Sequence, residues 1–229
     1  MSKVRDYSHV VPITEKAFVL AALRDGELRT DGRRATDARA MVINLSRERP
    51  EADAKGSSGR ARAPDATAEV QMGKTRAIAV VSADIDKPNE SRPNEGWLQI
   101  SVDLTPMASP ANAVGRPSPR EIFIGDLVKK GIRDARAIDV EALCIVAGAH
   151  VWSVRVDVHV VDDGGNAADA ASLAAIAALL HFRRPDVSIV GEGDIKVHAV
   201  DERAPVPLSV HHVPVAVSFA LVAVPRAGA

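Results

Sequence analysis

The sequence predicts an α/β fold with a strand hairpin and the following helix at its centre. Three observations in the stretch Leu143 to Pro185 support this prediction. Every second residue from Trp152 to Val160 is large and apolar with polar residues between, which is typical of a strand with one buried face. The turn Asp162-Asp163-Gly164-Gly165-Asn166 then leads into an Ala-rich segment with helical spacing. Leu143 to Val146 supplies the hairpin partner of the strand.

The helix after this turn is predicted over Ala167 to Leu180. Leu173, Ile176 and Leu180 form its bulkier stripe, and the small alanine side chains allow it to lie close to the sheet. The two glycines before it permit positive φ, and Asn166 can cap its first turn. Pro185 ends it, because proline lacks a backbone donor and biases the preceding residue away from the α conformation.

Composition indicates a soluble globular protein. The 229 residues are 46 % hydrophobic but only 3 % aromatic, so Val, Ile, Leu and Ala must build the core. No apolar run approaches the roughly 20 residues of a membrane span, and the start of the chain is polar, without a secretory pattern. Cys144 is the single cysteine, and we expect a core thiol in an intracellular protein. The net charge of −1 does not by itself indicate nucleic-acid binding.

The N-terminal part is predicted to begin with a short helix over Thr14 to Leu23. Thr14 can cap it, and Gly26 stands where a left-handed C-cap would lie. A buried stripe is expected at Phe18, Ala21 and Ala22. A polar turn with three arginines follows at Leu28 to Arg34.

A strand is expected at Met41 to Leu45. From Ser46 to Thr67 the chain has almost no large apolar residue, so we expect a mobile surface loop that joins two strands.

Two further strands and a helix are predicted in the middle of the chain. Ala77 to Ala83 and Leu98 to Leu104 read as strands, and Thr105 to Pro117 is irregular. Ser118-Pro119-Arg120-Glu121 matches a capping box with proline at the first helical position. The helix runs to about Arg136 and should face the core with Ile124, Leu127, Val128 and Ile132.

The last predicted elements are strands. Val187 to Val190 and Ile195 to Val200 are short, and Val213 to Val224 is the most apolar, with only five residues after it. We expect this uncovered apolar strand to make an isolated chain prone to aggregation.

Short motifs of enzyme sites are weak in this chain. Gly73-Lys74-Thr75 lacks the first glycine of a P-loop and precedes a strand, so it is interpreted as a turn. His211 and His212 are adjacent, and neighbouring strand residues point to opposite faces, which disfavours a shared metal ion. Asp162 and Asp163 add negative charge to the glycine turn, which makes it a poor phosphate site.

Arginines recur where the chain is irregular: Arg29, Arg33, Arg34, Arg92, Arg116 and Arg120. Scattered arginines usually form a solvated face. On turns they can also form a track for phosphate groups of a nucleic-acid backbone. The residues alone leave both interpretations open.

Several long motifs resemble the RNase PH family. They are Arg29-Thr30-Asp31-Gly32-Arg33, Asn94-Glu95-Gly96 with Leu98 to Pro110, Trp152 through the glycine turn, Ala170 to Pro185, and Pro205 to Pro214. Within the family they are most similar to the eukaryotic exosome ring subunit of the polymyositis/scleroderma autoantigen type. The resemblance covers roughly Ala17 to Leu221, except Ser46 to Thr67.

The resemblance implies an RNase PH-like α/β (α+β) fold, with mixed sheets packed against helices. Residues 1–229 would form one such domain, with a flexible loop at 46–67 and without the C-terminal part of the usual fold. The implied partners are other RNase PH-like exosome subunits in a hexameric ring, exosome cap proteins and single-stranded RNA, with no membrane. The implied locations are the nucleus, nucleolus and cytoplasm, and the implied roles are RNA degradation and processing, including that of rRNA.

The resemblance also bears on catalysis. Active members bind phosphate with a Gly-Gly-Thr-Arg type turn, and Ala167 or Ala168 takes the place of that arginine here. They carry catalytic carboxylates after the strand that matches Val213 to Val224, where this chain has Pro225 to Ala229 without a carboxylate side chain. We therefore expect a non-catalytic subunit without cofactor or metal.

Arg116, Arg120 and Arg92 are the candidate RNA-binding residues of this subunit. The alternatives are an active phosphorolytic 3′–5′ exoribonuclease and an unrelated α/β domain.

Overall fold

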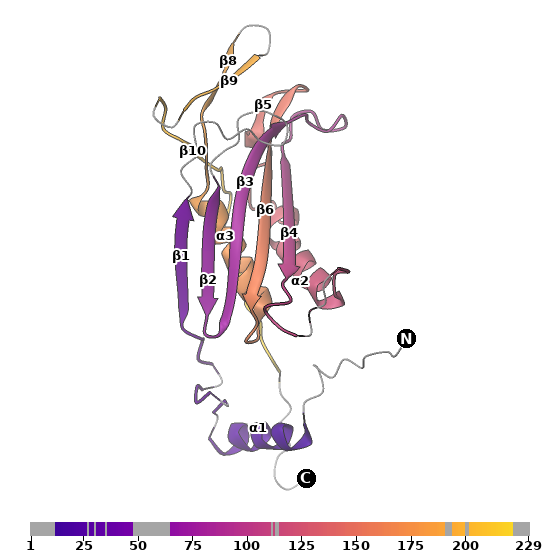
Figure 1. Cartoon of the computed structure of the whole chain (residues 1–229), viewed down its shortest axis with the longest axis vertical. Helices are drawn as coiled ribbons and strands as arrows, with labels where there is room; N and C mark the ends of the chain where they lie inside the picture. Colours follow the sequence, from indigo (N-terminus) through magenta and orange to yellow (C-terminus); the bar gives the residue numbers. More distant parts are fainter. Residues whose placement is uncertain are drawn as a thin grey trace. The chain divides into compact units, whose positions relative to one another are not determined.

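A computed structural model describes residues 12–26, 28–29, 31–34, 36–47, 65–110, 112, 115–190, 194–199 and 202–221 (Figure 1). The chain forms two compact units. The larger is Met41–Val217, and the smaller comprises Met1–Ala40 and Ser218–Ala229.

The smaller unit contains helix α1 (Ile13–Asp25), which confirms the predicted helix but corrects its details. The helix begins before Thr14, and its N-cap is Pro12, with no side-chain cap. Phe18 is 64 % exposed rather than buried, because a single helix and a polar turn provide no apolar layer in the described part of this unit. Gly26 is the C-cap, but its φ of −127° is not left-handed.

The predicted polar turn of the smaller unit is confirmed. Leu28 and Arg34 form an antiparallel bridge, and the Arg29 backbone N–H donates to the Arg33 carbonyl at 2.8 Å. Gly32 has a φ of +79°, which glycine adopts without steric cost.

The larger unit is built on a six-stranded sheet in the order β1-β2-β3-β6-β4, with β5 beside β6. Its strands are β1 (Met41–Arg47), β2 (Ala66–Met72), β3 (Thr75–Asp86), β4 (Trp97–Leu104), β5 (Cys144–Val146) and β6 (His150–Asp162). Among the strand pairs of the described residues, β4 and β6 are parallel and the others in this sheet are antiparallel. The mixed sheet confirms the predicted fold class.

Each strand predicted for this sheet is present. β1, β3, β4 and β6 are longer than predicted, and β5 is one residue shorter, because it begins at Cys144 rather than at Leu143. The expected loop at 46–67 is shorter, because Ser46 and Arg47 belong to β1 and Ala66 and Thr67 belong to β2. Residues 48–64, on which the predicted mobility falls, lie outside the described residues. Gly73-Lys74-Thr75 forms the β2–β3 turn, as predicted.

The core lies between the sheet and two helices on one of its faces (Figure 1). The predicted alternation of β6 is confirmed, because Trp152, Val154, Val156, Val158 and Val160 are at most 1 % exposed. Helix α3 (Ala167–His181) packs on β2 and β3. Fully buried alanines meet across this contact: Ala66, Ala68, Ala77 and Ala79 on the sheet, and Ala170, Ala171, Ala174 and Ala178 on the helix. Small side chains on both sides permit close approach.

Helix α2 (Pro119–Lys129) lies between β4 and β5 in the chain. Ser118 Oγ accepts a hydrogen bond from the Glu121 backbone N–H at 3.1 Å, and Pro119 is the first helical residue, so the predicted cap is confirmed. The helix widens into a π-helical turn, η1 (Lys130–Asp134). Among the residues predicted to face the core, Ile124, Val128 and Ile132 are buried and Leu127 is half-buried.

The chain then passes through a 3₁₀ turn, η2 (Glu141–Leu143), into β5. Cys144 on β5 is half-buried and is not among the core residues, so the expectation of a core thiol is wrong. Strand β5 is three residues long and pairs only with the start of β6, which leaves one side of the thiol accessible.

Four short strands follow α3: β7 (Arg183–Arg184), β8 (Val187–Val190), β9 (Asp194–Val197) and β10 (Val206–Pro207). The two predicted short strands are confirmed, although β9 ends at Val197 rather than at Val200. The structure adds that they pair as the antiparallel hairpin β8–β9.

The predicted strand Val213 to Val224 is wrong for its described part, residues 213–221, which are extended chain without strand pairing. A strand needs a hydrogen-bonding partner, and no described strand pairs with it. Val213, Val215 and Val217 are consequently exposed.

Candidate functional site

The parallel pairing of β4 and β6 determines where the candidate residues lie. Leu104 at the end of β4 is opposite Val160 near the end of β6. The carboxyl ends of parallel neighbours meet at one edge of a sheet, which is where α/β proteins place their ligand sites. The segment with Arg116 and Arg120 and the glycine turn before α3 therefore share this edge. We call it the carboxyl edge.

Asp163 organises the glycine turn at the carboxyl edge. Its side chain is only 6 % exposed, and its Oδ1 accepts a hydrogen bond from the Gly165 backbone N–H at 3.1 Å. Gly165 has a φ of +96°, so it needs the freedom of glycine. A Cβ on Gly164 would lie 2.7 Å from the Lys74 Cβ. The β2–β3 turn thus lies against this turn, and Thr75 Oγ1 donates to the Gly165 carbonyl at 2.6 Å.

Arg120 forms an ion pair with Asp163, through its Nη1 and the Asp163 Oδ2. The bond fastens the first turn of α2 to the turn before α3, 43 residues further along the chain. The Arg120 side chain is still 42 % exposed, and a guanidinium has five N–H donors. It can therefore hold Asp163 and present other donors to a second anion.

Arg116 is exposed, and no hydrogen bond or ion pair involves it within the described part of the chain. It lies four residues before Arg120 in the chain, and Arg120 itself contacts the glycine turn at the carboxyl edge. Arg92 is not with them. It lies before β4, whose eight residues span roughly 23 Å, and it pairs with Glu95 at 3.0 Å. RNA binding by these three arginines stays a prediction.

The start of α3 carries no cationic side chain. Asn166 adopts a left-handed φ of +59° and makes no side-chain cap bond to the backbone, so the expected cap is wrong. Its Nδ2 instead donates to Asp169 Oδ2 at 2.7 Å. Ala167 is buried and Ala168 half-buried. With the nearly buried Asp163 before it, this helix start is unsuited to clamp a phosphate ion.

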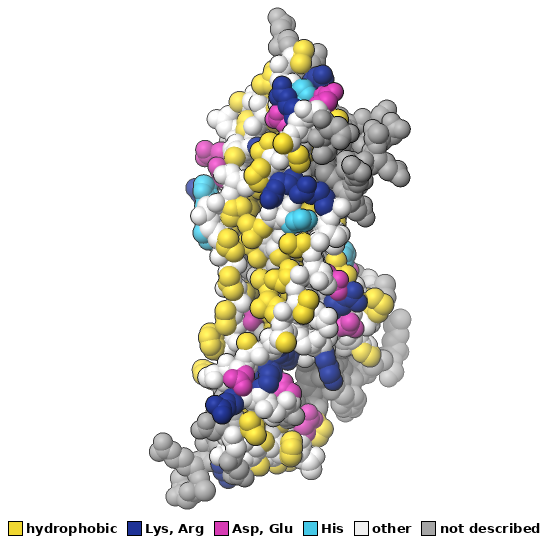
Figure 2. All heavy atoms as spheres, turned by 90° about the vertical axis from the view of Figure 1, so that its left-hand side faces the viewer, with side chains coloured by type: hydrophobic (Ala, Val, Ile, Leu, Met, Phe, Trp, Pro, Cys, Tyr) yellow, Lys and Arg dark blue, Asp and Glu magenta, His cyan; other side chains and the backbone are white. Residues whose placement is uncertain are grey.

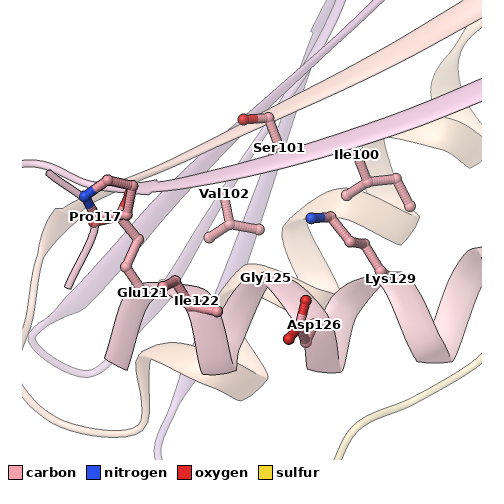
Figure 3. A pocket seen from close by; sticks show the side chains of 9 residues that line it. All are labelled: Ile100, Ser101, Val102, Pro117, Glu121, Ile122, Gly125, Asp126 and Lys129. Atoms are coloured by element: carbon pink, nitrogen blue, oxygen red, sulfur yellow. The ribbon is translucent and has the colours of Figure 1, made fainter. Parts of the chain in front are cut away.

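A pocket of about 230 Å³ lies between β4 and α2 (Figure 3). Ile100, Val102 and Ile122 form its apolar wall. Glu121, Asp126 and Lys129 give it two acidic side chains and one basic side chain. The pocket is smaller than the usual 300–1,000 Å³ of small-molecule sites, and its net negative charge disfavours phosphate.

The other sequence motifs typical of enzyme sites do not form such sites in the described residues. Gly73-Lys74-Thr75 is a hairpin turn with φ +61° at Gly73 and no helix after it, so it is not a P-loop. Among the described residues, no group of three or more His, Cys, Asp or Glu side chains could hold a metal ion. No helix within those residues is long and apolar enough to cross a membrane.

The pairing of Arg120 with Asp163 was not predicted from the sequence. The sequence marks Arg120 as part of a capping box and Asp163 as part of a glycine turn, and neither pattern indicates that the two residues pair. A sequence pattern that could indicate this ion pair is a basic residue soon after one strand and an acidic residue directly after another strand. It becomes specific only when the two strands are known to be parallel neighbours.

Comparison with known proteins identifies the class of protein. The RNase PH family model, described as 3′ exoribonuclease family, domain 1, matches residues 53–185. Those residues include β2 to β6, α2, α3 and the carboxyl edge. The chain therefore belongs to the RNase PH family of 3′ exoribonucleases, and the predicted resemblance is confirmed.

The similar proteins are more specific than the family. Exosome complex component RRP45B of Arabidopsis thaliana is 42 % identical over 209 residues, which is 90 % of this chain and 44 % of that protein. Exosome complex component rrp45 of Schizosaccharomyces pombe is 42 % identical over 207 residues, 90 % of this chain and 65 % of that protein. Human RRP45 is 39 % identical over 206 residues, 90 % of this chain and 43 % of that protein. The chain thus spans 43 to 65 % of the length of these relatives.

Solved structures agree with this class. One chain of the Archaeoglobus fulgidus exosome with RNA bound to the active site matches with a TM-score of 0.66 and 30 % identity, over 87 % of this chain and 69 % of that one. An archaeal exosome core matches with a TM-score of 0.58 and 28 % identity, over 85 % and 65 %.

Proposed function

We propose that the chain is a non-catalytic RNase PH-like subunit of the RNA exosome ring, and that it binds single-stranded RNA during 3′–5′ RNA processing and degradation. Relatives named as exosome components, at about 40 % identity over 90 % of the chain, support membership of the exosome. The proposed partners are other RNase PH-like subunits in a hexameric ring and the cap proteins. The proposed locations are the nucleus, nucleolus and cytoplasm, which fluorescent tagging of the full chain tests.

The residues at the start of α3 are the main support for the proposal that this subunit has no phosphorolytic activity. Phosphorolysis needs an attacking phosphate held by cationic groups and by helix N–H donors. Here Ala167 and Ala168 begin the helix, and Asp163 occupies one side of the Arg120 guanidinium. An incoming phosphate would meet a carboxylate that is already paired and nearly buried. Because Asp163 offsets the charge of Arg120, little net positive charge remains there to hold a free phosphate dianion.

The same edge is suited to a weaker role in RNA binding. Arg116 and the free side of Arg120 can contact the phosphate backbone of a strand without holding a separate phosphate ion. Backbone contacts of this kind position a nucleic acid and carry no sequence information. We therefore propose that this subunit guides RNA rather than cuts it.

The second candidate function is an active phosphorolytic 3′–5′ exoribonuclease, which the family itself favours. Incubation of the purified chain with single-stranded RNA, phosphate and Mg²⁺ separates the two. We expect no release of nucleoside diphosphates. Release that is lowered by the Arg116→Ala and Arg120→Ala substitutions would contradict the proposal, because a contaminating nuclease would not respond to them.

Purification of the tagged chain from cells tests its membership of the ring. We expect RNase PH-like subunits and cap proteins to copurify with it. Their absence would contradict this part of the proposal and leave the nuclease assay as an independent test.

A further inference from the structure

Strand β1 is an edge strand of the sheet that the described residues form. It pairs with β2 on one side, and no strand in the described ranges pairs with its other side. All seven of its residues are exposed. On the open side, backbone N–H and C=O groups of alternate residues are free to pair with another extended chain.

The side chains of β1 make this edge apolar on the face that carries α3. Met41, Ile43 and Leu45 lie opposite Met72, Val70 and Ala68, so they belong to the buried face of the sheet. They are nevertheless 43 to 51 % exposed, because α3 lies mainly over β2 and β3. We call Met41, Ile43 and Leu45 the β1 strip. Leu180 of α3 is also exposed.

A basic cluster lies at the carboxyl end of the β1 strip. Arg47 Nη2 donates to the His181 carbonyl at 3.1 Å. Arg183 Nη1 donates to the carbonyls of Leu180 and Phe182 at 2.7 and 2.8 Å. Both arginines thus contact the C-terminal end of α3. Neither contacts a carboxylate within the part of the chain that the structure describes.

The positive charge of Arg47 and Arg183 affects the neighbouring His181. Burial lowers the pKa of His181, and the charges of Arg47 and Arg183 lower it further. Figure 2, which faces this side of the sheet, shows apolar side chains along the middle of the molecule and a band of basic side chains across them.

We propose that the β1 edge binds an extended segment of a partner protein, with apolar residues at alternate positions and acidic residues where it meets Arg47 and Arg183. An added strand would pair with the open backbone groups and cover the β1 strip with every second side chain. Its carboxylates would form charge-assisted hydrogen bonds with the arginines. RNA would complement only the arginines and leave the β1 strip in water, so the apolar strip favours a polypeptide. This inference does not depend on the proposed role in RNA binding.

Synthetic peptides test the proposal on the 229-residue chain. Two ten-residue probes alternate valine and threonine and carry three glutamates, one probe at its N-terminus and the other at its C-terminus. Two control peptides carry lysines instead. We expect one acidic probe to bind, as measured by fluorescence anisotropy, and the lysine peptides not to bind. Failure of both acidic probes to bind at up to about 1 mM, a free energy near −4 kcal/mol, would overturn the proposal.

Matched variants assign the binding to this edge. Arg47→Glu should lower the affinity for the acidic probe at least about tenfold and allow a lysine peptide to bind. Arg47→Lys should retain most of the affinity for the acidic probe. Ile43→Thr should weaken binding severalfold. Val42→Thr is its control, because Val42 is equally exposed on the opposite face of β1, and Arg133→Glu controls for a change of surface charge. Equal losses in Ile43→Thr and Val42→Thr would contradict the proposal.

Circular dichroism confirms the fold of each variant, and the reversal of charge preference in Arg47→Glu is a result that unfolding cannot produce. If Arg47→Glu instead weakens binding of single-stranded RNA and leaves the peptides unaffected, the cluster binds phosphate groups and the proposal is wrong.

Discussion

The carboxylate of Asp163 holds two parts of the carboxyl edge together. One oxygen accepts the Gly165 N–H, and the other pairs with Arg120. Because the side chain is nearly buried, the loss of either partner leaves a polar group with few alternatives. Arg120 is then a positioning residue for the turn as well as a candidate RNA contact.

A double-mutant cycle measures this link. Asp163→Ala and Arg120→Ala should each destabilise the protein by about 1 to 3 kcal/mol. The double variant should lose less than the sum, with a coupling of about 1 kcal/mol, because the partly exposed Arg120 weakens the pair. Urea unfolding of the four proteins gives the coupling. Strict additivity would mean that the ion pair contributes nothing in solution.

Position 164 requires glycine because there is no room for a Cβ atom, and not because of its backbone conformation. Gly164→Ala should destabilise the protein by about 1 to 3 kcal/mol, because its Cβ would lie 2.7 Å from the Lys74 Cβ and 3.1 Å from the Lys74 carbonyl carbon. Gly131→Ala is the control, since nothing lies within 4 Å of its Cβ, and it should be neutral or slightly stabilising. Thermal unfolding compares the two. Equal effects would show that the β2–β3 turn does not lie against the glycine turn.

Among the secondary-structure elements, the β8–β9 hairpin is held by two acidic side chains. Arg203 Nη1 donates to Asp186 Oδ2 at 2.8 Å, and this bond is the main cause that lowers the pKa of Asp186. A hydrogen bond from His198 and the charge of Lys196 lower the pKa of Glu202. Ser188 Oγ lies 2.7 Å from the other ring nitrogen of His198. The hairpin is therefore fixed by side chains on both sides of its base.

The sign of these shifts predicts a pH dependence. Carboxyl groups with lowered pKa stabilise the folded state above their ordinary pKa values, 3.8 for Asp186 and 4.5 for Glu202. That contribution is lost as the pH falls through the lowered values. Carbon-detected NMR should show the pKa of Asp186 rising towards 3.8 in Arg203→Ala but not in Arg203→Lys. An unchanged pKa in Arg203→Ala would show that the pair does not form.

The strands of the sheet could be predicted because apolar and polar side chains alternate within the sequence of each segment. Trp152 to Val160 needs no knowledge of its neighbours to be recognised as a half-buried strand. The local chemistry of Ser118 and Pro119 likewise identifies the start of α2. These signals act over a few residues and do not depend on topology.

Burial and pairing between segments could not be predicted in this way. Phe18 lies on a helix whose unit offers no described apolar layer. Val213 to Leu221 has the composition of a strand but finds no partner among the described strands. The contact of Arg120 with Asp163 depends on the parallel order of β4 and β6. Each outcome is decided by parts of the molecule distant in sequence.

For the molecule as a whole, the exposed apolar segments predict self-association of the purified chain. The β1 strip and Val213, Val215 and Val217 are exposed together, and such surfaces associate in water. Light scattering after size-exclusion chromatography should show species larger than a monomer as concentration rises. Val215→Lys with Val217→Lys should reduce them. A monodisperse monomer at high concentration would contradict this expectation.

We propose that the carboxyl edge binds RNA without cutting it, and the RNA affinity of the assembled ring tests this proposal most directly. Arg116→Ala is the variant of choice, because Arg116 precedes α2, is exposed and makes no hydrogen bond or ion pair among the described residues. Arg92→Ala, at the other end of β4, tests whether the contacts extend along the strand. Both rings must first be shown to assemble fully.

We expect Arg116→Ala to weaken binding of single-stranded RNA equally for all sequences. The slope of the logarithm of the binding constant against the logarithm of the salt concentration should become shallower by about 0.7 for each lost phosphate contact. No nucleoside diphosphates should form at this subunit in either ring. Unchanged affinity and salt slope in a fully assembled Arg116→Ala, Arg120→Ala ring would contradict the account.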